Sequence, residues 1–189
     1  MSLKDSLKDK FANKWDLLPE FDEKYMSDVY SRIASDVSKK YKVLPSSDTI
    51  YNRFKFLNPE DVRIVFMTKD PICTYKQSTE WQLLSRQIED ECFNGLNLNL
   101  EDNMDYLIPQ GVIHLSPSFT ACNMTDHSNI GWLRFYNTVL QQLMKSPNPI
   151  LFVSKYDDFY HDIKLEKRCF KKINEWMLKH YNTNINWGI

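Results

Sequence analysis

Three short apolar runs, separated by longer amphipathic segments, most constrain the fold of this chain. The runs 62–67, 111–115 and 150–153 are rich in β-branched residues and are bounded by turn-forming residues, as expected of buried strands. Apolar residues spaced three or four positions apart predict helices around them, at 7–15, 25–37, 79–91, 132–143 and 165–176. This alternation predicts an α/β fold with a small, mainly parallel sheet of three or four strands and helices on both faces.

Length and charge limit the kind of protein further. The sequence of 189 residues contains no linker, repeat or low-complexity tract, so residues 1–189 are expected to form a single domain. The net charge is −1, whereas proteins that bind DNA over a broad surface are usually basic, because Lys and Arg release counterions from the phosphates. Any role on nucleic acid must therefore depend on a local basic patch.

Cysteine and histidine usage gives no sign of a metal site or of secretion. The four cysteines include no C-x-x-C pair and the four histidines complete no zinc pattern, so we expect no metal and no cofactor. The Lys-rich start lacks the apolar core of a signal peptide, and no apolar run is long enough to cross a membrane. We therefore expect buried free thiols, no membrane partner and an intracellular location: the nucleus, the cytoplasm or a viral replication site.

Five segments carry a resemblance to a known family; in chain order they are WDLLPEF, VRIVFMTKDP, LIPQGVIHLSPSFT, DHSNIGW and INW. They resemble the opening segment, the strand before the Gly-Gln-Asp-Pro-Tyr-His motif, the Gln-Gly-Val-Leu-Leu-Leu-Asn strand, the Ser-His and Gly-Trp spacing and the closing Ile-Asp-Trp of family-1 uracil-DNA glycosylases. The resemblance spans nearly the whole chain. It implies a uracil-DNA glycosylase-like fold with its functional residues at the carboxyl ends of the strands.

The resemblance also assigns functional positions, most of which carry other residues here. Asp70 matches the aspartate that activates the attacking water. Lys69 replaces the glutamine that contacts uracil, Ile72 the tyrosine that excludes the thymine methyl, and Ser116 the asparagine that hydrogen-bonds the uracil edge. Lysine only donates hydrogen bonds, and serine is too short to make both contacts of an asparagine. Asp70 is thus interpreted as a relic or residual catalytic aspartate, with an ordinary Asp-Pro turn as the alternative.

The segment after the third predicted strand differs most from the family. Lys155 and Tyr156 stand where the family has its Gly-Ser phosphate loop. The family's fourth strand, and the His-Pro-Ser-Pro-Leu-Ser loop whose histidine stabilises the departing uracil anion, are expected to be missing, which leaves His161 as the histidine of this segment. With Ser78 and His127, these residues are candidate contacts to DNA or to a protein partner. The structural alternatives are loop support by His127 and a surface position for His161.

These differences gather at the strand exits, where chemistry would occur, and loss of one charge-stabilising group typically costs about a hundred- to a thousandfold in rate. The leading hypothesis is therefore a pseudoenzyme: a non-catalytic binding or scaffolding protein of DNA replication or repair, with weakened DNA binding and a protein partner. An active divergent glycosylase that uses Asp70 and a DNA-independent interaction module are the alternatives. We also expect no pocket at the Asp70 exit large enough for a pyrimidine.

Overall fold

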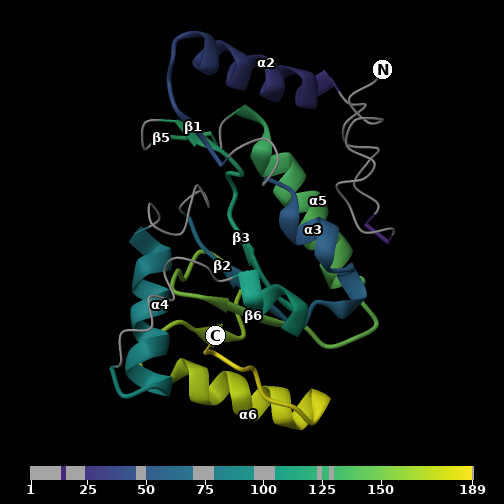
Figure 1. Ribbon diagram of the computed structural model, residues 1–189. Coiled ribbons are helices and arrows are strands. Elements are labelled where there is room, and N and C mark those ends of the chain that lie inside the picture. The colour runs from purple at the N-terminus through teal and green to yellow at the C-terminus, as the bar shows by residue number, and fades with distance from the viewer. Residues whose placement is uncertain are drawn as a thin grey trace.

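A four-stranded parallel sheet lies at the centre of the computed structural model (Figure 1). The structure describes residues 14–15, 24–45, 50–69, 79–95, 105–122, 125–127 and 130–188. Neighbouring strands pair in parallel in the order β3-β2-β6-β7, with bounds β2 Ile64–Met67, β3 Val112–Leu115, β6 Leu151–Ser154 and β7 Ile163–Lys164. The predicted small parallel sheet is confirmed.

The edge strand β7 corrects the expectation that the fourth strand is missing. Its two residues pair in parallel with the end of β6, with Ile163 opposite Val153. A strand of two residues that includes a lysine has no apolar run by which the sequence could reveal it. The four residues 165–168 then lead into α6 (Cys169–Tyr181), so Leu165 precedes the last helix instead of belonging to it.

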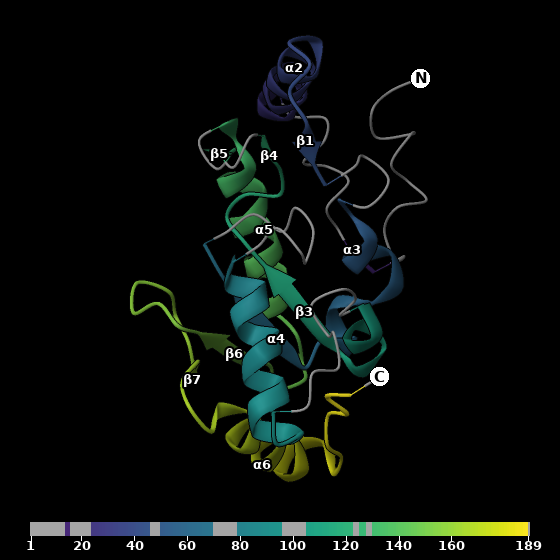
Figure 2. The ribbon, with the colours of Figure 1, turned by 60° about the vertical axis from the view of Figure 1, so that its left-hand side comes forward.

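Helices cover both faces of the sheet, because successive side chains of each strand point to opposite sides. Val65 and Met67 of β2 face a core that α2 (Lys24–Ser38), α3 (Asn52–Phe56) and α5 (Trp132–Met144) help to build. Ile64 and Phe66 face the opposite core, built with α4 (Thr79–Cys92), α6 and the final segment through Trp187. Figure 2 shows α4 crossing in front of the sheet with α6 below it. The prediction of helices on both faces is confirmed.

Most of the predicted helices match the structure closely. The segments 25–37, 79–91 and 132–143 correspond to α2, α4 and α5. The expected opening helix at 7–15 falls outside the described residues except for its end, where Trp15 is buried. Two short 3₁₀ helices, η3 (Pro59–Asp61) and η5 (Asp105–Gln110), precede β2 and β3. No helix in the described part of the chain is both long and apolar enough to cross a membrane.

A second, three-stranded sheet was not predicted from the sequence. It contains β1 (Val43–Leu44), β4 (Ala121–Cys122) and β5 (Thr125–Asp126), paired antiparallel in the order β1-β4-β5. Figure 1 shows this sheet beneath α2. Gly131 holds α2 close to the start of α5: its φ is +118°, and a Cβ atom there would lie 2.6 Å from Val29 Cγ2. Glycine is the residue that fits both this backbone and this close contact.

Candidate functional site

The carboxyl ends of β2, β3 and β6 bring three predicted site residues to one edge of the sheet. Lys69 lies just after β2, Ser116 follows β3 and Lys155 follows β6. The backbone carbonyl of Lys69 accepts a hydrogen bond from Ser116 Oγ over 3.3 Å, which joins the first two exits directly. Asp70, Ile72 and Ser78 lie outside the described residues, so their roles stay predictions.

The Ser116 hydroxyl is used within the protein. Ser116 is only 1% exposed; its Oγ donates to the Lys69 carbonyl and accepts from the backbone amide of Ser118 over 3.3 Å. A hydroxyl has one proton to donate, and here that proton is engaged by a backbone carbonyl. In this arrangement Ser116 offers no donor to a bound base.

Lys69 and Tyr156, predicted separately, lie in contact. Lys69 Nζ is 2.8 Å from Asp158 Oδ2 and 4.4 Å from the centre of the Tyr156 ring. Lys155 Nζ lies 4.9 Å from the same ring. The hydrogen bond from Lys69 lowers the pKa of Asp158, yet both side chains are about half exposed or more, so the pair contributes little to stability. The Lys69 cation therefore faces its own chain's carboxylate and aromatic ring.

A groove of about 720 Å³ opens beside this cluster, between α4 and the exits of β2 and β6. That volume falls in the usual range of small-molecule pockets. Because Asp70 lies outside the described residues, the expectation of no pyrimidine-sized pocket at its exit stays a prediction. Among the described residues, the lining of the groove includes neither Ser116 nor a histidine. Its rim carries four basic side chains and two acidic ones: Arg86, Lys155, Lys167, Arg168, Asp90 and Glu91.

The turn at 165–168 closes one side of the groove and is held by a carboxylate from α4. Glu91 accepts hydrogen bonds from the backbone amides of Arg168 and Phe170, at 2.5 and 3.2 Å. Gln87 Nε2 donates to Glu91 Oε1 over 3.0 Å and to the Glu166 carbonyl over 2.6 Å. The first amides of a helix are a favourable place for an anion, and here Glu91 itself occupies them.

His161 lies away from the groove. It precedes β7, and the next residue, Asp162, bonds through its amide to the Phe152 carbonyl near the start of β6. Since β6 and β7 are parallel, this places His161 toward the amino ends of the strands. Its Nδ1 donates to the Phe159 carbonyl over 2.8 Å. Of the neighbouring aromatic residues, Phe159 packs against the core, while Tyr160 is 63% exposed.

His127 also lies apart from the groove, in a buried hydrogen-bond network. Its Nδ1 is 2.9 Å from Thr120 Oγ1, which also accepts from Trp132 Nε1 over 2.7 Å. The His127 amide donates to Ser118 Oγ over 2.9 Å. We call Ser118, Thr120, His127 and Trp132 the buried network, since each is at most 5% exposed.

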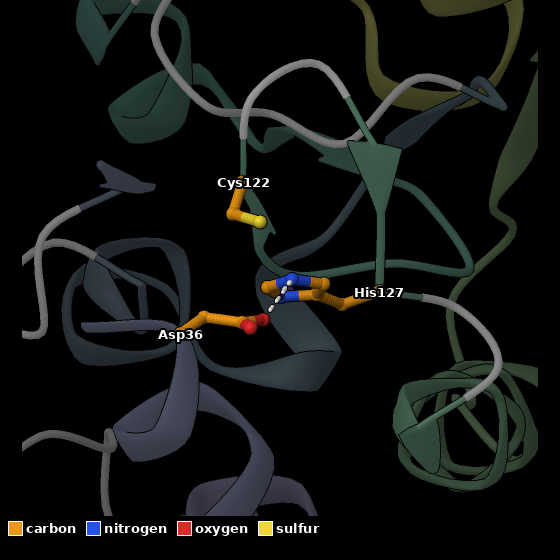
Figure 3. A group of neighbouring side chains, drawn as sticks. All are labelled: Asp36, Cys122 and His127. Atoms are coloured by element: carbon orange, nitrogen blue, oxygen red, sulfur yellow. Dashed lines mark ion pairs between the residues drawn. The ribbon is translucent and has the colours of Figure 1, made fainter. Parts of the chain in front are cut away.

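One group of side chains within the described residues has the spacing of metal ligands. Asp36, Cys122 and His127 offer ligand atoms that all lie within 4.8 Å of one another (Figure 3). Burial chiefly, and the Asp36 carboxylate next, raise the pKa of the Cys122 thiol. Sequence spacing did not reveal this group, because Asp36 comes from α2 and the other two residues come from the second sheet.

Comparisons with known proteins agree with this architecture. The chain is 23% identical over 154 residues to the uracil-DNA glycosylase of Francisella tularensis, covering 73% of this chain and 70% of the relative. It is 27% identical over 164 residues to uracil-DNA glycosylase 2 of Listeria monocytogenes, covering 76% and 71%. These sequence similarities, over about three quarters of the chain, support a member of the uracil-DNA glycosylase superfamily. No model of a protein family matches it.

Solved structures show the same fold for this superfamily member. Mimivirus uracil-DNA glycosylase superposes with a TM-score of 0.69 at 15% identity, covering 100% of this chain and 94% of that chain. A variant of mimivirus UNG in complex with UGI gives a TM-score of 0.71 at 16% identity, covering 97% and 91%. The resemblance drawn from the five sequence segments is thus confirmed for family and fold.

Sequence reasoning left one buried histidine of the glycosylase homologue without a role. His114, in the middle of β3, places Nε2 2.6 Å from Thr68 Oγ1 at the β2 exit, and Arg53 Nη1 donates to its backbone carbonyl over 2.5 Å. Burial, and then the charge of Arg53, hold the pKa of His114 well below its ordinary value, so the ring is neutral at pH 7. The available signal was a histidine inside the otherwise apolar run VIHL.

The described cysteines of the glycosylase homologue, Cys92, Cys122 and Cys169, are free thiols. Burial raises the pKa of Cys169 to about 12, so this thiol is protonated at neutral pH. Cys169 is buried as expected, whereas Cys92 is exposed and Cys122 partly buried, so the expectation of buried thiols is wrong for Cys92.

Proposed function

We propose that this protein is a non-catalytic member of the uracil-DNA glycosylase superfamily that binds DNA in replication or repair through the groove at the strand exits. Its relatives are named uracil-DNA glycosylases, which supports DNA as the class of ligand. The proposal has two parts. The site lacks groups that would stabilise a departing base, and it has groups that would bind a DNA backbone.

The observation that carries the proposal is the Glu91 carboxylate at the start of α6. Cleavage of the bond between uracil and the sugar places negative charge on the departing base, and stabilising such charge is usually the largest single contribution to catalysis. The family carries a histidine after its fourth strand for this purpose. Here the four residues after β7 contain no histidine, and the first amides of α6 bond to Glu91. A carboxylate at this position disfavours a second anion.

The other uracil-contacting positions support the same conclusion. The Ser116 proton is donated to the Lys69 carbonyl, and Lys69 Nζ pairs with Asp158. A base that reached these two positions would have to break these contacts before either side chain could bind it. Asp70 would then act without the groups that read the base, and a lone carboxylate supplies no stabilisation of negative charge.

The rim of the groove supports DNA binding without chemistry. Arg86, Lys155, Lys167 and Arg168 outnumber the two acidic side chains of the rim, so the groove is locally basic although the chain carries a net charge of −1. Glu91 is also partly neutralised by the amides that it accepts from. Tyr156 lies next to Lys155, and an aromatic ring beside a basic groove is the arrangement that holds single-stranded nucleic acid.

An excision assay on uracil-containing single- and double-stranded DNA tests the loss of catalysis, with Asp70→Asn as the matched variant. We expect no cleavage above background for either protein. Cleavage by the wild type that Asp70→Asn abolishes would overturn the proposal in favour of an active, divergent glycosylase.

Titration with the same DNA at increasing salt concentrations tests the binding half of the proposal. Contacts to phosphates make log K fall linearly with log[salt], with a slope of about −0.7 per contact for single strands. With four basic side chains on the rim, we expect a slope of about −2 to −3. Affinity that is absent or independent of salt would instead support the DNA-independent interaction module, for which the exposed Tyr160 is a candidate aromatic contact.

A further inference from the structure

Three side chains from separate elements point into a common space on the side of the molecule where α2 lies over the second sheet (Figure 3). Asp36 lies in the last turn of α2, Cys122 ends β4, and His127 directly follows β5. Their ligand atoms, a carboxylate oxygen, a thiol sulfur and an imidazole nitrogen, all lie within 4.8 Å of one another. This group lies apart from the groove and has no part in the function proposed above.

The spacing of these atoms suits a tetrahedral metal ion. Zinc binds imidazole nitrogen and carboxylate oxygen at about 2.0–2.2 Å, which in a tetrahedron places the two ligand atoms about 3.4 Å apart. His127 Nε2 and Asp36 Oδ2 are 3.4 Å apart. In the same tetrahedron the Cys122 sulfur would lie about 3.6 Å from the other two ligand atoms, which requires them to approach by at most about 1.3 Å.

The buried network fixes His127 in the orientation of a metal ligand. Its Nδ1 bonds to Thr120 Oγ1 over 2.9 Å, which directs Nε2 toward Asp36 and Cys122. Thr120 is held in turn by Trp132 Nε1, and Ser118 Oγ holds the His127 amide. Metal-binding histidines generally have such a partner on the second ring nitrogen, because it sets the tautomer and the angle of the ring.

The charges around the group balance those of a divalent ion. A thiolate and a carboxylate neutralise Zn²⁺, which removes the cost of placing a net charge in a partly buried site. Lys39 lies 3.6 Å from Asp36 Oδ1, the carboxylate oxygen other than the one facing His127, so Asp36 can pair with Lys39 and still bind a metal. Mixed nitrogen, sulfur and oxygen ligands favour zinc over Mg²⁺ or Ca²⁺, which prefer oxygen alone.

We propose that Asp36, Cys122 and His127 bind one Zn²⁺ ion, with water as the fourth ligand, and that this ion ties the end of α2 to the β4–β5 hairpin. The site departs from the sequence-based expectation of no metal, which considered only the spacing of cysteines and histidines along the chain. Here the fold brings together an aspartate from α2 and a cysteine and a histidine from the second sheet.

Co²⁺ titration of the metal-free full chain tests the sulfur ligand directly, because a thiolate bound to Co²⁺ gives a charge-transfer band in the near ultraviolet. We expect one Co²⁺ per chain, visible bands of tetrahedral intensity and loss of the thiolate band in Cys122→Ser. Cys92→Ser changes another free cysteine, exposed and outside the group, and should leave the spectrum unchanged. A thiolate band that survives in Cys122→Ser, or binding without such a band, would overturn the proposal.

Zinc competition against a chromophoric chelator measures the affinity with the physiological ion. We expect Cys122→Ser and Asp36→Asn each to lower zinc affinity by about a hundredfold or more, and Thr120→Val, which removes the partner of His127 Nδ1 but changes no ligand, by about ten- to a hundredfold. Because Asp36 and Cys122 are only partly buried, their variants should remain folded, and circular dichroism checks this. Unchanged zinc affinity in both ligand variants would leave Asp36 and His127 as an ion pair alone and overturn the proposal.

A thermal melt provides a readout in the intact protein. Since a ligand that binds only the folded state stabilises it, excess Zn²⁺ at about a hundred times Kd should raise Tm by about 5–10 °C. Cys122→Ser should lose this shift and Cys92→Ser should keep it. A shift of equal size in both variants would show that zinc acts elsewhere on the chain and overturn the assignment.

Discussion

The rim of the groove and the buried network both place polar side chains near the ends of strands, but they differ in how those side chains are held. In the groove region, Lys69 and Asp158 pair while their side chains remain 48% and 60% exposed. In the buried network, Thr120 is fully buried and bonds to both a histidine and a tryptophan ring. Exposed ion pairs add little to stability, whereas a buried polar group that loses its partner is costly. Stability should therefore depend on the network, and recognition on the groove.

The strongest test of the network's role in stability is Thr120→Val, which keeps the shape of the side chain and removes its hydroxyl. Trp132 Nε1 and His127 Nδ1 then lose their shared partner in a buried site. We expect the free energy of unfolding to fall by about 3 kcal/mol, since each buried polar group left without a partner costs about 1–3 kcal/mol. Urea denaturation of the metal-free protein measures this change.

Thr138→Val on α5 is the matched control for that substitution. Thr138 Oγ1 bonds only to the Arg134 carbonyl one turn earlier, at a site open to solvent. Its loss should change the free energy of unfolding by less than about 0.5 kcal/mol. Equal effects of the two substitutions would show that the network adds no more to stability than an ordinary surface hydroxyl.

A second test concerns His114, the buried ring beneath the groove. Because its pKa in the folded protein is held below the ordinary value of 6.5, the unfolded chain binds a proton first as the pH falls. This contribution to stability is complete above pH 6.5 and is lost as the pH falls from there toward the folded-state pKa. The slope approaches about 1.4 kcal/mol per pH unit. Denaturation between pH 7.5 and pH 5 should show this fall in the wild type and a flatter profile in His114→Gln.

Thr68→Val separates the titration of His114 from its hydrogen bond. That substitution removes the partner of His114 Nε2 but leaves the buried ring in place, so stability should fall at every pH while most of the slope remains. If stability depends on pH as steeply in His114→Gln as in the wild type, other groups cause the pH dependence. His114 would then not be the group that titrates.

The sequence predicted the parts of the molecule that depend on local pattern. The continuous apolar run predicted the strand whose residues Ile64 and Val65 face opposite sides of the sheet. The helical repeat of apolar residues that includes Val29 predicted the buried face of α2. Strands of two residues, such as β7 with Ile163 and Lys164, are too short to carry a pattern. They form because the neighbouring strand offers free backbone groups, which a sequence does not display.

The candidate site was less predictable, because its important contacts join positions far apart in the chain. The resemblance led to Lys69 and Ser116 but did not show that the serine hydroxyl bonds to the lysine backbone. Nothing near Glu91 in the sequence indicates that its carboxylate reaches the first amides of α6. Asp36 and His127 likewise meet only through tertiary packing. Motif spacing thus located the exits, and the fold determined what the side chains do there.

Glu91 contributes both to stability and to the groove, because it accepts hydrogen bonds from amides at the start of α6 and lines the groove. Glu91→Ala removes the acceptor for two helix amides and should lower the free energy of unfolding by about 1 kcal/mol, while Glu91→Gln keeps an acceptor and should cost less. Both variants remove a negative charge from the rim and should tighten DNA binding. Denaturation and DNA titration on the same samples measure the two effects. If either variant binds DNA more weakly, Glu91 does not oppose anions in the groove.

The smallest effect on stability, and the clearest effect on binding, is expected for Lys155→Ala and Lys167→Ala. Both side chains lie on the rim and neither is deeply buried, so urea midpoints should match the wild type. Each substitution should weaken binding to DNA of any sequence and make the plot of log K against log[salt] less steep by about 1, because one phosphate contact is lost. Lys145→Ala, just after α5 and outside the groove lining, should leave that slope unchanged. If Lys145→Ala and Lys155→Ala weaken DNA binding equally, binding depends only on the overall charge of the protein. The groove would then not be the DNA-binding surface.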